Sequence, residues 1–141
     1  MYLLDTNVVS ELRKGHTSGV AAWATSVPQS LMYLSVISVM EIETGILRLQ
    51  RRDTRQAAAL QTWFTRQVLP TFAGRILPID LDVARRCAAL HVPSPRSDRD
   101  ALIAATALNA GLIVVTRNLA DFTPTGVDVL NPWDFSPAED V

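Results

Sequence analysis

The sequence is poor in cysteine, histidine and lysine. Cys87 is the only cysteine, which excludes an intrachain disulfide and any metal cluster held by several thiolates. A chain without disulfides fits a reducing compartment, and we expect a cytoplasmic protein. With only 2 histidines and one cysteine, we also expect no zinc site.

Long apolar runs are missing as well. The longest, residues 101–115, is interrupted by Asn109 and Gly111 and is shorter than the ~18 residues that a bilayer span needs. The first residues carry no basic segment followed by an apolar stretch, so we expect no signal peptide.

An excess of charge of either sign is also absent. The net charge of −1 gives the chain no global electrostatic attraction to nucleic acid. Because Lys14 is the only lysine, nearly all positive charge is carried by arginine, which suits forked contacts to phosphate or carboxylate. A genome with biased composition would give the same skew.

What is present is a core-forming composition and a regular alternation of patterns. The chain has 141 residues, 48% of them hydrophobic and 19% charged, which predicts one folded domain over residues 1–141. Short apolar runs predict strands, and helical periodicity with caps predicts the helices between them. The predicted strands are 2–4, 31–37, 76–79, 112–115 and 127–130. The predicted helices are 8–14, with Thr6-Asn7 as the turn and cap before it, and 18–27, 38–51, 53–68, 80–91 and 98–110, with a helical turn at 118–122.

This alternation predicts an α/β fold, a three-layer α/β/α sandwich around a mainly parallel sheet. We expect a loop between Pro70 and Gly74, and a buried helix over 98–110 because that segment is apolar on nearly all sides.

Three acidic residues stand where strands give way to helices, and a fourth, Asp100, lies in the first turn of the helix that precedes the fourth strand. Asp5 directly follows the first strand, Glu41 lies early in the helix after the second, and Asp121 follows the strand that ends near Thr116. Because ligands bind at the carboxyl edge of an open parallel sheet, these three are expected to converge there. Asp100 joins them only if the start of its own helix faces the same edge.

Each acid also has a purely structural interpretation. Ser38-x-x-Glu41 has the form of a capping box, and Asp100 and Asp121 stand at the same offset from Ser97 and Asn118. Acids in a first helical turn are favoured by the helix dipole. Asp5 fits this interpretation least, because an unpaired carboxylate after a buried strand is costly.

A cluster of carboxylates repels itself unless a cation lies among its members. An oxygen-only ligand set suits Mg²⁺, with Mn²⁺ as a possible substitute. The residues alone therefore favour a cation site where Asp5, Glu41 and Asp121 are expected to meet, with Asp100 as a conditional fourth ligand and a structural interpretation still open for each acid.

The four acids lie within four longer segments: Leu4-Asp5-Thr6-Asn7-Val8-Val9-Ser10-Glu11-Leu12, Ser35-Val36-Ile37-Ser38-Val39-Met40-Glu41 with Gly45-Ile46, Asp100-Ala101-Leu102-Ile103-Ala104-Ala105-Thr106-Ala107, and Val115-Thr116-Arg117-Asn118-Leu119-Ala120-Asp121-Phe122. In order and spacing these segments resemble the PIN-domain toxins of the VapC type, in particular the VapC/FitB-like branch. The likeness extends to Leu130-Asn131-Pro132-Trp133 and so covers essentially the whole chain.

The resemblance implies a PIN fold and an endoribonuclease that uses Mg²⁺ or Mn²⁺ and a metal-activated water. It implies the toxic component of a type II toxin–antitoxin module, which forms a homodimer and a hetero-oligomer with a cognate VapB-type antitoxin. By position it assigns Asp5, Glu41, Asp100 and Asp121 as catalytic metal ligands, with Asn7, Thr116 and Asn118 as supporting polar residues.

Two assignments required a choice between neighbouring acids. The continuation after Asp100 favours it over Asp98, which we interpret as a helix cap, and Gly45-Ile46 favours Glu41 over Glu43. Three arginines flank the acids in sequence and are candidates for contacts to RNA phosphates, with an ordinary solvated surface as the alternative: Arg96, Arg99 and Arg117.

Other functions stay open at this point. One is a different Mg²⁺-dependent phosphoryl-transfer hydrolase, although Asp5-Thr6-Asn7 lacks the second aspartate that a phosphoaspartate enzyme uses. Another is a non-catalytic PIN-like domain that binds RNA or protein. A dinucleotide-binding module is disfavoured because no Gly-x-Gly-x-x-Gly follows the first strand.

Overall fold

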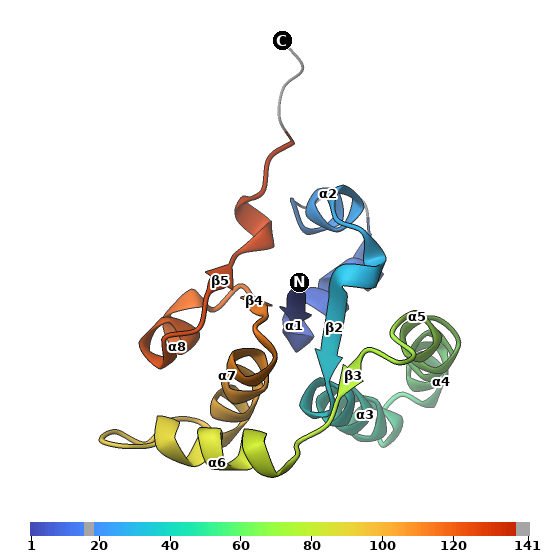
Figure 1. The fold of residues 1–141 in the computed structure, drawn as a ribbon. Coiled ribbons are helices and arrows are strands. Elements are labelled where there is room, and N and C mark those ends of the chain that lie inside the picture. The colour runs from blue at the N-terminus through green and yellow to red at the C-terminus, as the bar shows by residue number, and fades with distance from the viewer. Residues whose placement is uncertain (16–18, 138–141) are drawn as a thin grey trace.

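Five parallel strands form the centre of the molecule. The structure is a computed structural model and describes residues 1–15 and 19–137. The strands are ordered β3-β2-β1-β4-β5, and every neighbouring pair is parallel (Figure 1). Their bounds are β1 Tyr2–Leu4, β2 Met32–Ser35, β3 Ile76–Leu77, β4 Ile113–Val115 and β5 Val129–Leu130.

The order of the strands reverses beside β1. The chain proceeds from β1 outward through β2 to β3, then crosses to β4 and continues outward to β5. Leu4 lies opposite Val115 in the register of β1 and β4. The carboxyl ends of β1 and β4 therefore flank the switch point of the sheet, where open α/β folds bind their ligands.

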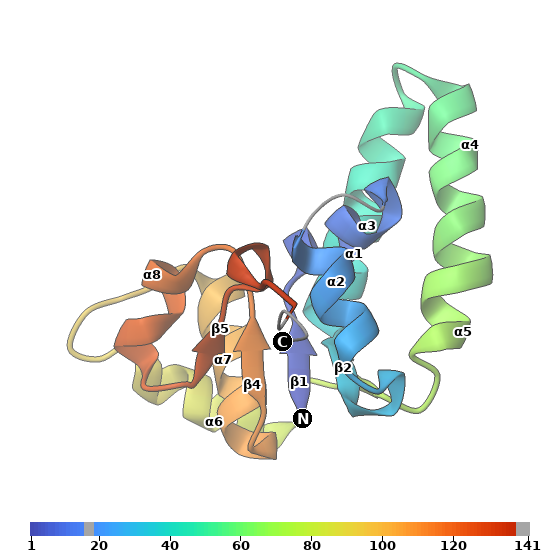
Figure 2. The same ribbon diagram turned by 90° about the horizontal axis from the view of Figure 1, so that it is seen from above.

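Helices connect the strands and cover both faces of the sheet. The antiparallel pair α3 and α4 projects beyond the sheet as a hairpin, which is plain when the molecule is seen from above (Figure 2). The helix bounds are α1 Thr6–Lys14, α2 Gly19–Ser26, α3 Val36–Gln50, α4 Thr54–Trp63, α5 Leu69–Thr71, α6 Leu81–Leu90, α7 Asp98–Ala110 and α8 Leu119–Phe122. None of these helices is long and apolar enough to cross a membrane.

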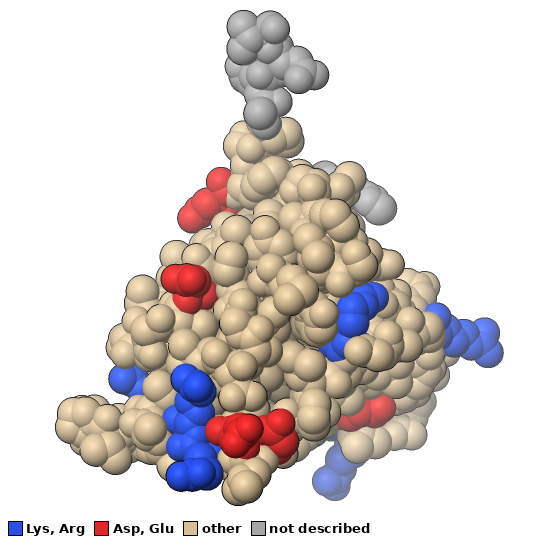
Figure 3. All heavy atoms as spheres, viewed as in Figure 1, with Lys and Arg blue, Asp and Glu red and all other residues tan. Residues whose placement is uncertain are grey.

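Charged side chains do not gather into one broad patch on the face of Figure 1. In the space-filling view of that face, the basic and acidic side chains are scattered and partly adjacent (Figure 3). This agrees with the small net charge, and any attraction of a polyanion to this face must come from local groups.

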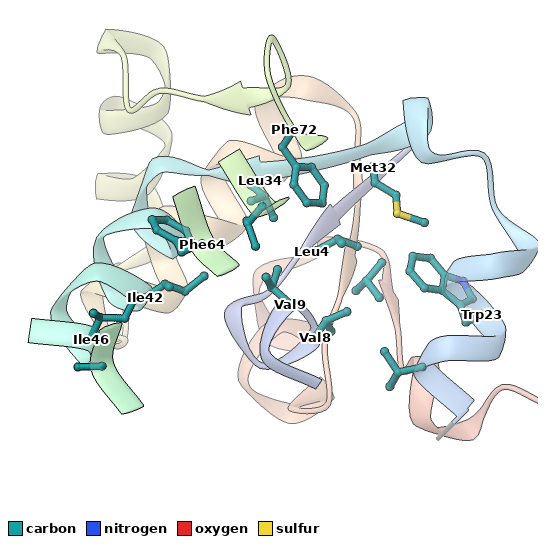
Figure 4. Packing of buried hydrophobic residues seen from close by; sticks show 14 residues of the cluster. Leu4, Val8, Val9, Trp23, Met32, Leu34, Ile42, Ile46, Phe64 and Phe72 are labelled. Carbon is teal, nitrogen blue, oxygen red and sulfur yellow. The ribbon is translucent and has the colours of Figure 1, made fainter. Parts of the chain in front are cut away.

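Alternating side chains of the strands pack into different layers. Leu4 and Val115 join the cluster that α1 to α4 and the segment after α4 complete, in which Trp23, Phe64 and Phe72 are the largest buried side chains (Figure 4). Leu3 and Val114 point to the opposite face and pack under α7 and α8. The three-layer α/β/α sandwich is therefore confirmed, and α7 is buried as its sequence predicted.

The second strand ends earlier than the sequence predicted. We expected a strand over 31–37 and a helix from Ser38, but β2 ends at Ser35 and α3 begins at Val36. The Ser35 hydroxyl accepts a hydrogen bond from the backbone N–H of Ile37 at 3.0 Å and so caps the helix. This cap prevails over the β-propensity of Val36 and Ile37.

The helix predicted over 53–68 is present but continues further than expected. After α4 the chain forms a π-helical segment, Phe64–Val68, and continues directly into α5, which includes Pro70. The expected start of a loop at Pro70 is wrong. A wider π turn before a proline accommodates a ring nitrogen that cannot donate to the preceding turn.

Candidate metal and nucleic-acid site

Asp5 is the centre of the polar site and bridges the switch point of the sheet. Its backbone N–H still donates to Val115 O at 2.9 Å, as part of the sheet. Its side chain is fully buried: Oδ1 accepts from the N–H of Thr6 at 2.8 Å, and Oδ2 accepts from the Thr116 hydroxyl at 2.8 Å. Asp5 is thus the cap of α1, a position that we expected at Thr6 and Asn7.

Glu41 approaches Asp5 from α3. Because α3 begins at Val36, Glu41 lies in the second helical turn, and the expected capping box with Ser38 is wrong. Ser38 is instead buried inside the helix. The Thr6 hydroxyl donates to Glu41 Oε1 at 2.8 Å and is 3.0 Å from Ser38 Oγ. These contacts fix the carboxylate of Glu41 beside the start of α1.

Asp100 reaches the same place from the first turn of α7. The Ser97 hydroxyl caps this helix and accepts from the N–H of Asp100 at 3.3 Å. The expected cap at Asp98 is wrong, since Asp98 is the first residue inside the helix and its exposed side chain is 3.4 Å from His91 Nε2. Asp100, and not Asp98, therefore faces the site.

One guanidinium joins three of the four acids. Arg99 Nε is 2.6 Å from Glu41 Oε2 and Nη1 is 2.6 Å from Asp100 Oδ1, while Nη2 contacts Asp5 Oδ1. The carboxyl of Asp5 is completely inaccessible and those of Glu41 and Asp100 are 28% and 17% exposed, so these are not loose surface pairs. Asp5, Glu41 and Asp100 thus converge, and a positive charge lies among them.

The pKa values of these groups show the same electrostatic situation. Burial alone would lower the pKa of Arg99, but its hydrogen bond to Glu41 and the charge of Asp5 outweigh burial and raise it. Burial raises the pKa of Asp100, and the hydrogen bond from Arg99 opposes that rise. Asp121 adds to the rise through its negative charge, so Asp121 also belongs to the electrostatic neighbourhood of the site.

The remaining predicted polar residues lie around Asp5 and Asp121. Thr116 also accepts from the N–H of Asn118 at 3.0 Å, and Asn118 precedes α8, whose first turn contains the exposed Asp121. The amide nitrogen of Asn7 is 3.5 Å from Asp5 Oδ2, and its Oδ1 is buried without a hydrogen-bond partner among the residues that the structure describes. That oxygen is a spare acceptor, which is uncommon in a folded interior.

The other candidate residues lie differently. Arg96 donates to Leu90 O at 2.9 Å, and Arg117 lies over the ring of Trp133 at 5.1 Å. Within the described residues Glu43 forms no ion pair. Contacts of Arg96, Arg99 and Arg117 to RNA stay a prediction.

The donor set fits a hard divalent cation in its chemistry. Asp5, Glu41 and Asp100 present only oxygens, and the orphaned Asn7 Oδ1 is one more. In the described part of the chain no three metal-binding side chains are drawn together closely enough to hold an ion, and Arg99 occupies the point at which the carboxylates meet. The ligand atoms are therefore of the kind that Mg²⁺ prefers, and the guanidinium of Arg99 lies between them.

A second group of potential ligands lies outside this site. Cys87 and His91 are one helical turn apart at the end of α6, with Sγ and Nε2 3.9 Å apart. His91 Nδ1 accepts from the N–H of Arg96 at 3.1 Å, so in the neutral ring Nε2 carries the proton and has no lone pair for a metal. His16 lies outside the described residues.

Sequence reasoning missed part of the site. It treated Thr6 as a turn residue and Ser38 as a cap, and it considered Arg99 only for RNA. For Ser38 a signal was available, because it stands three residues before Glu41 and therefore on the same helix face. For Thr6 and Arg99 the partners are 35 and 58 residues away along the chain, and no local pattern reveals them.

Comparisons with known proteins agree with this fold. The family model described as PIN domain matches residues 2–122. "VapC ribonuclease Y4jK" of Sinorhizobium fredii is 38% identical over 140 residues, which cover 95% of this chain and 99% of the relative.

Solved structures give the same likeness. The crystal structure of FitAcB from Neisseria gonorrhoeae matches with a TM-score of 0.87 and 37% identity, over 96% of this chain and 100% of that one. A toxin–antitoxin complex from Klebsiella pneumoniae matches with a TM-score of 0.71 and 29% identity, over 96% and 100% of the two chains.

Proposed function

This chain belongs to the PIN domain family, and from that premise we propose that it is the ribonuclease toxin of a toxin–antitoxin pair, cleaving RNA with Mg²⁺. The observation that carries the proposal is the convergence of three carboxylates, from the end of β1, from α3 and from α7, at the switch point of a parallel sheet. Relatives that match over nearly the whole chain are named as a ribonuclease and as part of a toxin–antitoxin complex.

The roles of this chain's own residues follow from their positions. Asp5, Glu41 and Asp100, with Asp121 nearby, would hold the metal, and Thr6 and Thr116 orient the first two of these acids. Mg²⁺ bound there would supply Lewis acidity toward a phosphodiester and lower the pKa of a water. The buried side of the site, around Asp5, excludes bulk water and strengthens each electrostatic contact.

A VapB-type antitoxin is the proposed partner. Solved relatives at 29% identity include a toxin–antitoxin complex, and that chain is covered over its full length. We also propose a homodimer, as the resemblance implies. Size-exclusion chromatography with light scattering, with and without a purified VapB-type antitoxin, would measure both associations.

Cleavage is expected to require a divalent ion. Treatment with EDTA should abolish cleavage of total RNA by the purified protein, and added Mg²⁺ or Mn²⁺ should restore it, because the carboxylates need a cation to act on phosphate. Mapping of the ends should find 5′-phosphate and 3′-hydroxyl groups. Full activity in EDTA with 2′,3′-cyclic phosphate ends would contradict the proposal, since it would mean attack by the ribose 2′-hydroxyl.

The same assay separates the alternatives. A different Mg²⁺-dependent phosphoryl-transfer hydrolase would release phosphate from small phosphate esters and leave RNA intact. A non-catalytic PIN-like domain would bind RNA or protein without cutting. Metal-dependent cleavage of RNA is the outcome expected for the proposed function alone.

Thr6 is expected to act as a positioning residue for Glu41. Thr6→Val keeps the shape of the side chain but removes the hydroxyl that donates to Glu41 Oε1 at 2.8 Å. We expect RNA cleavage to fall by about 10- to 100-fold, because a displaced ligand weakens the whole site, with a loss of about 1 kcal/mol in stability. Thr6→Ser, which retains the hydroxyl, should recover most of the activity; equal losses in both variants would contradict this role.

A further inference from the structure

Arg99 satisfies the acidic site with a single side chain. Its three guanidinium nitrogens are directed at three different carboxylates: Nε at Glu41, Nη1 at Asp100 and Nη2 at Asp5. Each contact lies within ion-pair distance, and the carboxylates come from three separate elements. The guanidinium thus occupies the position where the positive charge of a metal would be needed.

The guanidinium of Arg99 stays close to the three carboxylates because its backbone is part of α7. Arg99 directly precedes Asp100 in the first turn of α7, so its backbone cannot leave the site while α7 stays packed against α6 and the sheet. A charge held beside its partners has a high effective concentration and does not depend on binding from solution. The side chain is nevertheless 30% exposed, so it has a route to solvent without any movement of the helix.

The single positive charge of Arg99 does not neutralise the negative charge of the site, so a divalent ion can replace it. Four carboxylates lie in or beside the site, and Arg99 supplies one positive charge among them. Beside Asp5, Asn7 has a buried Oδ1 that no described residue hydrogen-bonds. A divalent ion would neutralise more of this charge than Arg99 does, while using the same oxygens of Asp5 and Glu41.

We propose that Arg99 is an internal counter-cation, which holds Asp5, Glu41 and Asp100 together in the metal-free protein and competes with the divalent ion for their oxygens. The inference rests on the proposed metal-dependent function and adds a regulatory element to it. Metal entry requires the guanidinium to leave these oxygens. Arg99 therefore sets the metal concentration at which the site is loaded.

Competition of this kind has a defined magnitude. The apparent dissociation constant equals the intrinsic constant divided by the fraction of molecules in which the site is open. If Arg99 occupies the site in about 90–99% of metal-free molecules, its removal tightens metal binding by about 10- to 100-fold. A residue that only helped to hold the metal would have the opposite effect.

The test measures metal affinity and not activity. Mn²⁺ binding to the metal-free protein is followed by electron paramagnetic resonance of the free ion, for the wild type, Arg99→Gln, Arg99→Lys and Arg117→Gln. We expect Arg99→Gln to bind Mn²⁺ at least about tenfold more tightly than the wild type. Arg99→Lys should lie between the two, because an ammonium keeps the charge but not the three-way fork.

Arg117→Gln is the matched control for the change in charge. It removes the same charge beside Thr116, but its guanidinium lies over Trp133 at 5.1 Å and not among the acids. Its Mn²⁺ affinity should stay within about twofold of the wild type, because exposed charges are screened over about 10 Å. An equal gain in Arg117→Gln and Arg99→Gln would overturn the proposal.

A second measurement uses the wild-type protein and so does not depend on the folding of a variant. Arginine modification by phenylglyoxal, located by peptide mass spectrometry, should be slow at Arg99 without metal and at least about fivefold faster with saturating Mg²⁺ if the guanidinium is released. Unchanged reactivity, or Mn²⁺ affinity that is unaltered or weaker in Arg99→Gln, would overturn the inference alone. Absence of Mn²⁺ binding in the wild type and in Arg99→Gln would overturn both the inference and the proposed function.

Discussion

Asp5→Asn is expected to lower the rate of RNA cleavage by about a thousandfold or more, while the protein stays folded. Asp5 is the only acid of the site that is completely buried, and it accepts hydrogen bonds from α1, from Thr116 and from Arg99. Replacing the carboxylate by an amide removes its charge and one acceptor oxygen at the point where the metal would bind.

The fold should survive because asparagine has the shape of aspartate and can keep the cap of α1. The remaining oxygen can accept from the Thr6 N–H, as Oδ1 does now at 2.8 Å. The new amide nitrogen would face the Thr116 hydroxyl, which can rotate to accept, and Asn7, whose free Oδ1 is available after a flip of its amide. We expect a loss of about 1–3 kcal/mol in the free energy of unfolding.

The measurement is the cleavage rate of a defined RNA, together with thermal unfolding followed by circular dichroism. Asp98→Asn is the matched control, because it removes the same charge near the start of α7 from a side chain that is 93% exposed and faces His91. It should keep activity within about twofold. Wild-type turnover in Asp5→Asn, or equal losses in the two variants, would show that the site is assigned to the wrong residues.

The position of Asp5 could be predicted from sequence for a specific reason. Parallel strands bring their carboxyl ends to one edge, so residues that directly follow two apolar runs come together without any knowledge of side-chain packing. Asp5 and Thr116 follow β1 and β4, and they are hydrogen-bonded at 2.8 Å. The strand–helix alternation that placed them also predicted the three layers correctly.

The position of Glu41 within its helix could not be predicted in the same way. Ser35 and Ser38 both stand before an apolar helical pattern, and either can cap a helix by its side chain. The structure uses Ser35, because β2 ends there, opposite Leu77 of β3. This choice depends on pairing between strands that are far apart in sequence, and it moves Glu41 into the second turn.

The place of Arg99 depends on tertiary contacts alone. In sequence it is one of many arginines and its neighbours are two aspartates, which predicts a solvated helix start. Only the packing of α7 beside α3 brings its guanidinium within reach of Glu41, 58 residues earlier. A positive side chain beside predicted metal ligands is therefore ambiguous until the fold is known.

Gly19→Ala is expected to be the most destabilising of the conservative substitutions, although the residue is far from the acids in sequence. A Cβ at this position would lie 2.8 Å from Trp133 O and 2.9 Å from both Pro132 O and Phe135 O. All three are backbone atoms, which cannot rotate away as the end of a side chain can. We expect a loss of about 1–3 kcal/mol in the free energy of unfolding and a Tm lower by about 3–10 °C.

The effect reaches the site through a short series of contacts. The new Cβ in α2 would push away the segment that contains Trp133. The guanidinium of Arg117, the residue after Thr116, lies over the ring of this tryptophan. Gly19→Ala should therefore lower stability strongly and cleavage per folded molecule only mildly, which Tm and single-turnover rates measured on the same sample would separate.

Gly45→Ala provides the matched control for this prediction. Gly45 lies inside α3, and a Cβ there would meet nothing within 4 Å. Because alanine is favoured over glycine within a helix, this substitution should raise stability by about 0.5–1 kcal/mol. A lower Tm in Gly19→Ala and a higher Tm in Gly45→Ala would attribute the loss of stability to the contact between α2 and the backbone of residues 132–135. A change of Tm in the same direction in both variants would contradict this explanation.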